Sequence, residues 1–305
     1  SVQPAIAPDG TLTFTPATNA NGSATVSVVT SDSGGAANGG RDRTTNSFRV
    51  TVTPVNDAPS VAFSTNVVAV LEDAGAQSFA AFATFTAGPA NESAQVLVGY
   101  TVSNSSNELF SVQPGIDNDG RLTFTPATNA NGSATVTVVV QDNSAAADGG
   151  VDKSTNTLTL TVVPVNDAPG VAFAQGTVTV VEDAGAQSVS AFATFSSGPV
   201  NESVQALVGY SVTVGNAALF ASAPAINNAG IMTFTPATNA NGSATVTVVV
   251  QDNGGTSDGG VDKSTNTFTI VVTSVNDTPV AGNDSYTVSQ GDALTVAAAG
   301  VLAND

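Results

Sequence analysis

Residues 122–136 read LTFTPATNANGSATV, and the same letters stand at residues 12–26. With Met232 in place of the leading leucine, they return at residues 232–246. Just downstream of the turn formers Asn and Gly in the second copy, every other residue is apolar: Ala134, Val136, Val138 and Val140. Alternation with a period of two is typical of a β-strand that buries one face. The stretch therefore predicts half-buried strands next to an Asn-Gly turn.

The three copies are spaced 110 residues apart, without an insertion. A second landmark keeps this period: PVNDAP stands at residues 54–59 and 164–169, and SVNDTP at residues 274–279. Proline stops strand pairing and Asn-Asp favours turns, so each hexapeptide predicts a module boundary. The expected segments are 1–59, the C-terminal half of a module; 60–169 and 170–279, two complete modules; and 280–305, the start of a module of another type.

Seven strands are predicted by alternation in the first complete module. They are residues 67–71, 77–86, 95–103, 108–112, 121–125, 133–141 and 155–163. Seven short strands in about a hundred residues indicate an immunoglobulin-like sandwich. The predicted fold class is therefore all-β, with tandem seven-stranded Greek-key β-sandwiches arranged as an extended rod.

The composition excludes several classes of function. The net charge is −18 with only six basic residues, so a basic surface for nucleic acid or for an anionic membrane is not expected. Histidine and cysteine are both absent, which removes the usual general base and the commonest transition-metal ligands. No run reaches the roughly 18 apolar residues that a membrane span needs. The sequence predicts a protein that is not an enzyme and has cations as natural partners.

An ordered set of motifs carries a family resemblance. Each complete module has Glu-Asp after its first predicted strand, then FTPATNANGSATVTV, then Gln-Asp-Asn and Asp-Gly-Gly, and finally a VNDAP or VNDTP linker. Together these motifs resemble the bacterial cadherin-like repeats of large secreted surface adhesins, such as the repeat regions of RTX-type adhesins. The segment from Ala281 resembles the start of a bacterial Ig-like repeat. The resemblance implies cadherin-like sandwiches, an extracellular or cell-surface location, and a role in adhesion or spacing.

Acidic residues gather at the expected junctions, because consecutive loops of such a sandwich alternate between its two ends. The junction at residues 164–169 then draws on Glu72, Asp73, Asn166, Asp167, Glu202 and Asp252. The counterpart sets are Asp57, Glu92 and Asp142 at residues 54–59, and Glu182, Asp183 and Asp277 at residues 274–279. Ca²⁺ accepts six to eight such oxygens in flexible geometry. We therefore expect calcium-bridged junctions, with Asp167 at the centre of the second.

Other interpretations of these features stay open. Asp and Asn also occur where turns favour them, and acidic surfaces keep extracellular proteins soluble. Pro164 stands where classical cadherins have Asp, which argues against three ions per junction. The alternative functions are accessory or glycan-binding repeats of a secreted polysaccharide-active enzyme, and a subunit of a self-assembling surface filament. The expected partners are calcium, neighbouring modules of the same chain, and a cell-surface or glycan receptor that the sequence does not identify.

Overall fold

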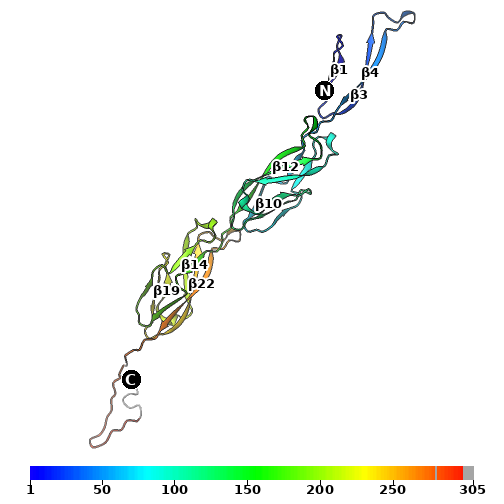
Figure 1. Ribbon diagram of the computed structural model, residues 1–305. Coiled ribbons are helices and arrows are strands. Elements are labelled where there is room, and N and C mark those ends of the chain that lie inside the picture. Colours follow the sequence, from blue (N-terminus) through cyan, green and yellow to red (C-terminus); the bar gives the residue numbers. More distant parts are fainter. Residues whose placement is uncertain (279, 298–305) are drawn as a thin grey trace. The chain divides into compact units, whose positions relative to one another are not determined.

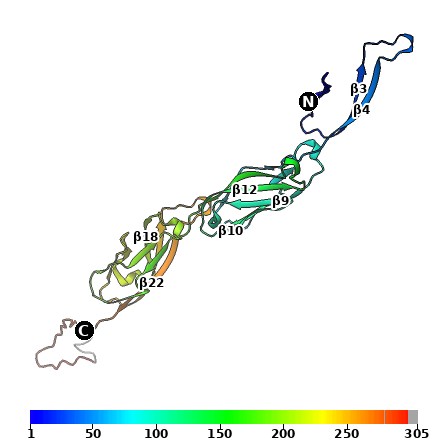
Figure 2. The same ribbon diagram turned by 45° about the horizontal axis from the view of Figure 1, so that its top comes forward.

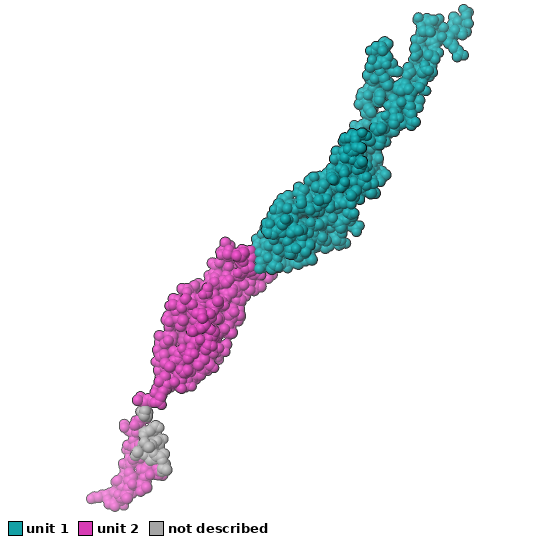
Figure 3. All heavy atoms as spheres, viewed as in Figure 1, with its two compact units in different colours: residues 1–165 teal, residues 166–305 magenta. Residues whose placement is uncertain are grey.

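The computed structural model describes residues 1–278 and 280–297. The chain divides into two compact units, Ser1–Val165 and Asn166–Asp305, which have different colours in Figure 3. Each unit contains one complete module with its own hydrophobic core. Pro279, at the end of the third predicted linker, and residues 298–305 of the predicted terminal segment lie outside the described residues.

The first complete module is built from short strands, labelled in part in Figure 1. They are β5 (Ser60–Phe63), β6 (Val67–Leu71), β7 (Gln77–Phe79), β8 (Ala83–Thr86), β9 (Leu97–Asn104), β10 (Phe110–Ile116), β11 (Leu122–Pro126), β12 (Gly132–Asp142) and β13 (Lys153–Val163). One sheet has the order β6-β13-β12-β9 and the other β10-β11-β7, while β5 pairs with β8. Figures 1 and 2 show β12 and β10 in the two layers of one sandwich.

The second complete module repeats this arrangement strand for strand. Its strands are β14 (Gly170–Phe173), β15 (Thr177–Val181), β16 (Gln187–Val189), β17 (Ala193–Ser196), β18 (Leu207–Val214), β19 (Phe220–Ile226), β20 (Met232–Pro236), β21 (Gly242–Asp252) and β22 (Lys263–Thr273). The sheets are β15-β22-β21-β18 and β16-β20-β19, and β14 pairs with β17. The all-β sandwich predicted from the repeat is confirmed in both modules.

Alternation along β12 and β13 builds the core of the first module. Val136 and Val138 on β12 are completely buried, and Leu158 on β13 lies opposite Val136 in the register. From the other sheet, Leu122 and Phe124 are buried in the same cluster. Full burial of a Val or Leu side chain contributes about 1.5–3 kcal/mol. The intervening residues, largely threonine, form the outer face, where β-branched side chains suit a pleated surface.

One strand prediction was wrong, because residues 77–86 form two strands. Ala81 lies between them with a φ of +51°. Beyond it, the N–H groups of Phe82 and Ala83 both donate to the carbonyl of Gly120, at 2.8 and 2.9 Å. The kink turns the chain away from its first partner, so β7 pairs with β11 and β8 pairs with β5. Alternation of apolar residues continues across the kink and therefore conceals it.

The structure also contains a strand that the pattern did not predict, and one pairing of unexpected direction. β5 directly follows the linker and was not predicted, so the module has nine strand segments where seven were expected. β6 pairs with β13 in parallel, with Val67 opposite Thr159. A period of two tells which face of a strand is buried, but it does not tell the direction of the neighbouring strand.

Unit 1 also contains residues that precede the first linker. They form two antiparallel hairpins, made of β1 (Val2–Ile6), β2 (Leu12–Thr15), β3 (Gly22–Ser31) and β4 (Arg43–Val52). The β3–β4 register pairs Gly22 with Val52, as β12–β13 pairs Gly132 with Val162. That residues 1–59 form the C-terminal half of a module stays a prediction. Residues 280–297 contain no strand, and a new module beginning there stays a prediction.

The helical elements of the described residues are three-residue 3₁₀ turns. They are η1 (Ala37–Gly39), η2 (Ala90–Glu92), η3 (Asn107–Leu109), η4 (Ala147–Gly149), η5 (Val200–Glu202), η6 (Ala217–Leu219) and η7 (Ser257–Gly259). In residues 1–278 and 280–297, no helix is long and apolar enough to cross a membrane. Two of the turns, η2 and η5, place the acidic residues Glu92 and Glu202 at module ends.

Candidate functional site

Each complete module has two ends, here called poles, at which linker residues meet acidic loops. The amino pole is the end where the preceding linker enters, and the carboxyl pole is the end where the last strand leaves. Hydrogen bonds group the loops as predicted: the loop after β6 and the turn before β12 meet at the carboxyl pole, while η2 and the loop after β12 meet at the amino pole. The two poles differ in how their carboxylates are satisfied.

At the carboxyl pole of the first module, Glu72 is buried and paired with protein donors. Its Oε1 accepts from the N–H of Val165 at 2.7 Å, and its Oε2 accepts from Nδ2 of Asn131 at 3.2 Å. Asp73 has a φ of +58°, and its Oδ1 accepts from the N–H of Asn129 at 3.1 Å. These bonds tie the end of β13 to the turn before β12. Glu72 thus fastens the first residues of the linker to its own module.

The carboxyl pole of the second module repeats the arrangement. Glu182 accepts from the N–H of Val275 at 2.8 Å and from Nδ2 of Asn241 at 3.4 Å. Asp183 accepts from the N–H of Asn239 at 3.3 Å. Asp277 is exposed, and its carbonyl accepts from Nδ2 of Asn276. Glu182 and Asp183 therefore lie at the pole and Asp277 on the linker, and their role as ligands stays a prediction.

At the amino pole of the second module, linker residues and two loops converge. Glu202 accepts from the N–H of Asp167 through Oε1 at 2.7 Å. Nδ2 of Asn166 donates to the carbonyl of Val261 at 2.8 Å and to Oδ1 of Asp252 at 3.3 Å. Asp252 and Glu202 are almost completely buried, with 2% and 4% of their surfaces exposed. Three acidic side chains and one amide thus belong to the same pole of the same module.

Several buried oxygens at this pole receive no hydrogen bond from the described residues. They are Oε2 of Glu202, Oδ2 of Asp252, Oδ1 of Asn166 and Oε1 of Gln205. A buried acceptor without a donor costs about 1–3 kcal/mol, and more if it is charged. Oε2 of Glu202 lies against Gly198, whose φ is +119° and where a Cβ would stand 2.5 Å from this oxygen. Glycine at this position leaves room for the carboxylate at the turn.

The electrostatics of this pole favour a positive partner. Burial raises the pKa of Glu202 above its ordinary value, and the nearby charges of Asp167 and Asp252 raise it further, while hydrogen bonds from the backbone of Asp167 and the side chain of Gln205 lower it. A hard cation accepts carboxylate and amide oxygens as ligands and removes the mutual repulsion of the carboxylates. The donor set of Glu202, Asp252 and Asn166 fits such an ion in chemical type.

The amino pole of the first module has the same elements in a different hydrogen-bond pattern. Glu92 accepts from the N–H of Asp57 through Oε1 at 2.8 Å, and its buried Oε2 receives no hydrogen bond from the described residues. Asn56 donates to the carbonyl of Val151 at 2.7 Å, and its Oδ1 accepts from Gln95. Both oxygens of Asp142 accept from Asn56 at 3.4 Å. One unpaired carboxylate oxygen therefore remains at this pole.

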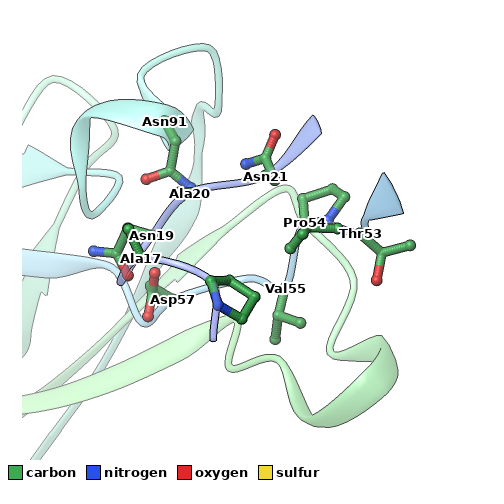
Figure 4. A pocket seen from close by; sticks show the side chains of 11 residues that line it. Ala17, Asn19, Ala20, Asn21, Thr53, Pro54, Val55, Asp57 and Asn91 are labelled. Carbon is green, nitrogen blue, oxygen red and sulfur yellow. The ribbon is translucent and has the colours of Figure 1, made fainter. Parts of the chain in front are cut away.

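Unit 1 holds a pocket of about 230 Å³ beside this pole (Figure 4). Asn19 and Asn21 from the turn before β3, Asp57 from the linker and Asn91 from η2 contribute its polar side chains. Residues 52–55 line another side. Oxygen-bearing side chains from three segments thus surround one space at the first linker.

Some of the predicted ligands lie at the same pole in the structure. Whether the others lie near them stays a prediction. Asp167, Glu202 and Asp252 share a pole in unit 2, whereas Glu72 and Asp73 belong to unit 1. Among residues 1–278 and 280–297, no group of three or more acidic side chains is close enough to hold a metal by itself. Amide oxygens would have to complete any site. Asn19, Asn21, Gln95 and Gln205 were not predicted as candidates. The shared TNANG turn and the Gln after each Asn-Glu-Ser were the available signals.

Comparisons with known proteins bear on the fold. No family model matches the sequence, and no curated protein is significantly similar. Among solved structures, extracellular cadherin domains 1–5 of protocadherin gamma B2 are 18% identical, with a TM-score of 0.51 over 84% of this chain and 47% of that chain. The fold is cadherin-like.

Two other cadherin structures match at lower structural similarity. Mouse protocadherin-24 EC1–3 is 15% identical, with a TM-score of 0.45 over 82% of this chain and 80% of that chain. Mouse cadherin-23 EC22–24 is 17% identical, with a TM-score of 0.44 over 83% of this chain and 74% of that chain.

Proposed function

We propose that this chain is a set of adhesion or spacer repeats from an extracellular, bacterial-type surface protein, and that calcium binds at the module poles and stiffens the array. The observation that carries the proposal is the pair of buried carboxylate oxygens without donors, Oε2 of Glu92 and Oε2 of Glu202, at equivalent positions of the two modules. Buried carboxylate oxygens normally have donors, as both oxygens of Glu72 do. The repetition of the unpaired oxygen supports a ligand role.

The residues that would hold the ion differ between the two modules in their supporting amides. In the second module they are Glu202, Asp252 and Asn166, with Asp167 beside them. In the first they are Glu92, Asp57 and Asp142, with Asn19, Asn21 and Asn91 around the adjacent pocket. Calcium would supply positive charge beside these carboxylates. Glu72 and Asp73 are also proposed as ligands at the second linker.

The composition and the location of the buried charged residues support a role as a spacer rather than as an enzyme. The chain has neither His nor Cys, and its buried charged side chains among the described residues lie at the poles. Each complete module is a small sandwich with a linker at each of its two poles. Recognition of a receptor would then fall to other surfaces of the parent protein, and the receptor itself is not identified by this chain.

Calcium titration of the whole 305-residue chain tests the proposal. At ten times a dissociation constant of about 0.1–1 mM, each site should add roughly 1.4 kcal/mol to the stability of its unit. Glu202→Gln should remove the calcium-dependent rise in the melting temperature of unit 2 and leave that of unit 1. Asp119→Asn removes the same charge from an exposed position that is Ala229 one repeat later, and serves as the control. If calcium leaves the melting of the parent chain unchanged, the cation hypothesis fails.

A further inference from the structure

Hydrogen bonds attach the linker between the two complete modules to both of them. Its residues up to Val165 bond to the first module, and its residues from Asn166 bond to the second. On the upstream side, Val163 is paired in β13 and its carbonyl accepts from the N–H of Glu72 at 2.9 Å. Pro164 follows with a ring-restricted φ. The N–H of Val165 then donates to Glu72 at 2.7 Å. The chain is therefore fastened to the first module as far as the nitrogen of Val165.

On the downstream side, the fastening begins at the next residue. The N–H of Val261 donates to the carbonyl of Asn166 at 2.8 Å, and the Asn166 side chain donates back to the carbonyl of Val261 at 2.8 Å. The N–H of Asp167 donates to Glu202 at 2.7 Å. Asn166 thus pairs with the loop before β22 and belongs to the second module. The boundary between the two compact units falls at the same bond, Val165–Asn166.

The other two linkers show that each fastening belongs to one module. At residues 54–59, Asn56 pairs with Val151 through its carbonyl at 2.9 Å and its side chain at 2.7 Å, as Asn166 does with Val261. At residues 274–279, Val275 donates to Glu182 as Val165 does to Glu72, while the side chain of Asn276 donates to the neighbouring Asp277. The downstream fastening occurs where a complete module follows, and the upstream fastening where a complete module precedes.

From this we infer that the articulation between the two complete modules is confined to the Val165–Asn166 link, and that it stays so confined without any cation. The peptide bond is planar, so the freedom left between the two fastenings is φ and ψ of Val165 and φ of Asn166. Val165 is β-branched, which restricts its backbone further toward extended conformations. The hexapeptide is accordingly a hinge at these three dihedral angles rather than a linker that is flexible along its whole length. This inference goes beyond the proposed function, because it does not depend on calcium.

Spin labels on the whole chain test the hinge. The sequence has no cysteine, so Thr101→Cys and Ser211→Cys, exposed equivalents in the two modules, give two unique labels. All measurements use a chelator, so that the calcium proposal does not enter. Inserting one glycine between Val165 and Asn166 should widen the label–label distance distribution about twofold, since it adds two free dihedrals to the hinge. The same insertion between Ala145 and Ala146, in an exposed loop, should leave it unchanged.

Two point variants with matched controls address the fastenings. Asn166→Ala should widen the distribution, and Asn56→Ala, its equivalent at the first linker, should not. Glu72→Ala should widen it, whereas Glu182→Ala should not. The melting temperature of each unit checks folding, and the glycine insertion touches neither core. The inference is overturned if the parent distribution is already as wide as that of the glycine insertion, or if Asn166→Ala and Asn56→Ala behave alike.

Discussion

The two complete modules share their strands and register but fill their cores differently. In the first, Phe79 on β7 lies with its ring centroid 6.4 Å from Phe82 and 6.1 Å from Phe124, and Leu158 stands on β13. In the second, the equivalent of Phe79 is Val189 and the equivalent of Leu158 is Phe268. The ring centroid of Phe268 lies 4.7 Å from that of Phe192 and 5.0 Å from that of Phe173. The first module thus has a phenylalanine on one sheet where the second module has one on the other sheet.

This exchange indicates that the fold requires a filled core volume rather than a particular residue at each site. Phe82 and its equivalent Phe192 stay in place, and each is contacted by a ring from one sheet or from the other. Protein interiors are close-packed, so a large side chain lost on one strand must be replaced nearby. The pair at 79 and 158 is therefore expected to behave as one unit.

Breaking this pair should have the largest effect. Phe79→Val alone leaves a cavity beside Phe82 and should destabilise unit 1 by about 2–3 kcal/mol. Leu158→Phe alone overpacks the same space and should cost about 1–3 kcal/mol. The double variant recreates the second module's pair and should recover at least half of the summed loss. Denaturant unfolding of the four chains gives the coupling energy. Strict additivity of the two single changes would show that these residues fill separate spaces.

The second difference lies at the amino pole, where Ser144 in the first module is Gly254 in the second. A Cβ at Gly254 would collide with Oδ1 of Asn166, and it would lie 2.8 Å from Nε2 of Gln205. In the first module, Oδ1 of Asn56 instead accepts from Nε2 of Gln95 at 2.7 Å. The equivalent asparagines Asn166 and Asn56 thus have different hydrogen bonds, one in the module with Gly254 and the other in the module with Ser144. Only the arrangement over glycine leaves the asparagine oxygen unpaired.

Exchanging these residues should have a smaller effect. Gly254→Ser should force Asn166 into the arrangement of Asn56, at a cost of about 1–2 kcal/mol for the displaced amides. Ser144→Gly removes no such constraint and should change the stability of unit 1 by about 0.5 kcal/mol or less. Thermal unfolding of both variants measures the costs, and a crystal structure shows the asparagine. The comparison fails if Asn166 in the Gly254→Ser variant keeps its hydrogen bond to the carbonyl of Gly255 and gains none from Gln205.

How far the sequence could predict these features depends on how far apart in the chain the interacting residues lie. The repeat at residues 122–136 and the period of two predicted the sandwich, because both depend on local alternation. The kink at Ala81 is set by the carbonyl of Gly120, a distant residue, and was not predictable from residues 77–86. The burial of Glu72 was not predicted either, because it depends on a distant backbone donor. Its partner, the N–H of Val165, is 93 residues away.

The smallest expected effect is the pH response of the second amino pole in the absence of calcium. The pKa of Glu202 is raised in the folded unit above its ordinary value of 4.5, chiefly by burial. A raised pKa means that the folded state binds the proton more tightly than the unfolded chain, so this contribution to stability is complete below the ordinary value and is lost as the pH rises through the raised one.

Lowering the pH from 7 toward 5 in a chelator should therefore increase the free energy of unfolding of unit 2 in the parent relative to the Glu202→Gln chain. Gln does not titrate, so the difference between the two chains isolates this group from the other carboxylates. Denaturant unfolding at several pH values measures it. Excess calcium should remove the gain, because an ion held by the carboxylate competes with the proton. Parallel stability curves for the two chains in the chelator would mean that solvent reaches Glu202 freely, and that its unpaired oxygen exerts no electrostatic cost.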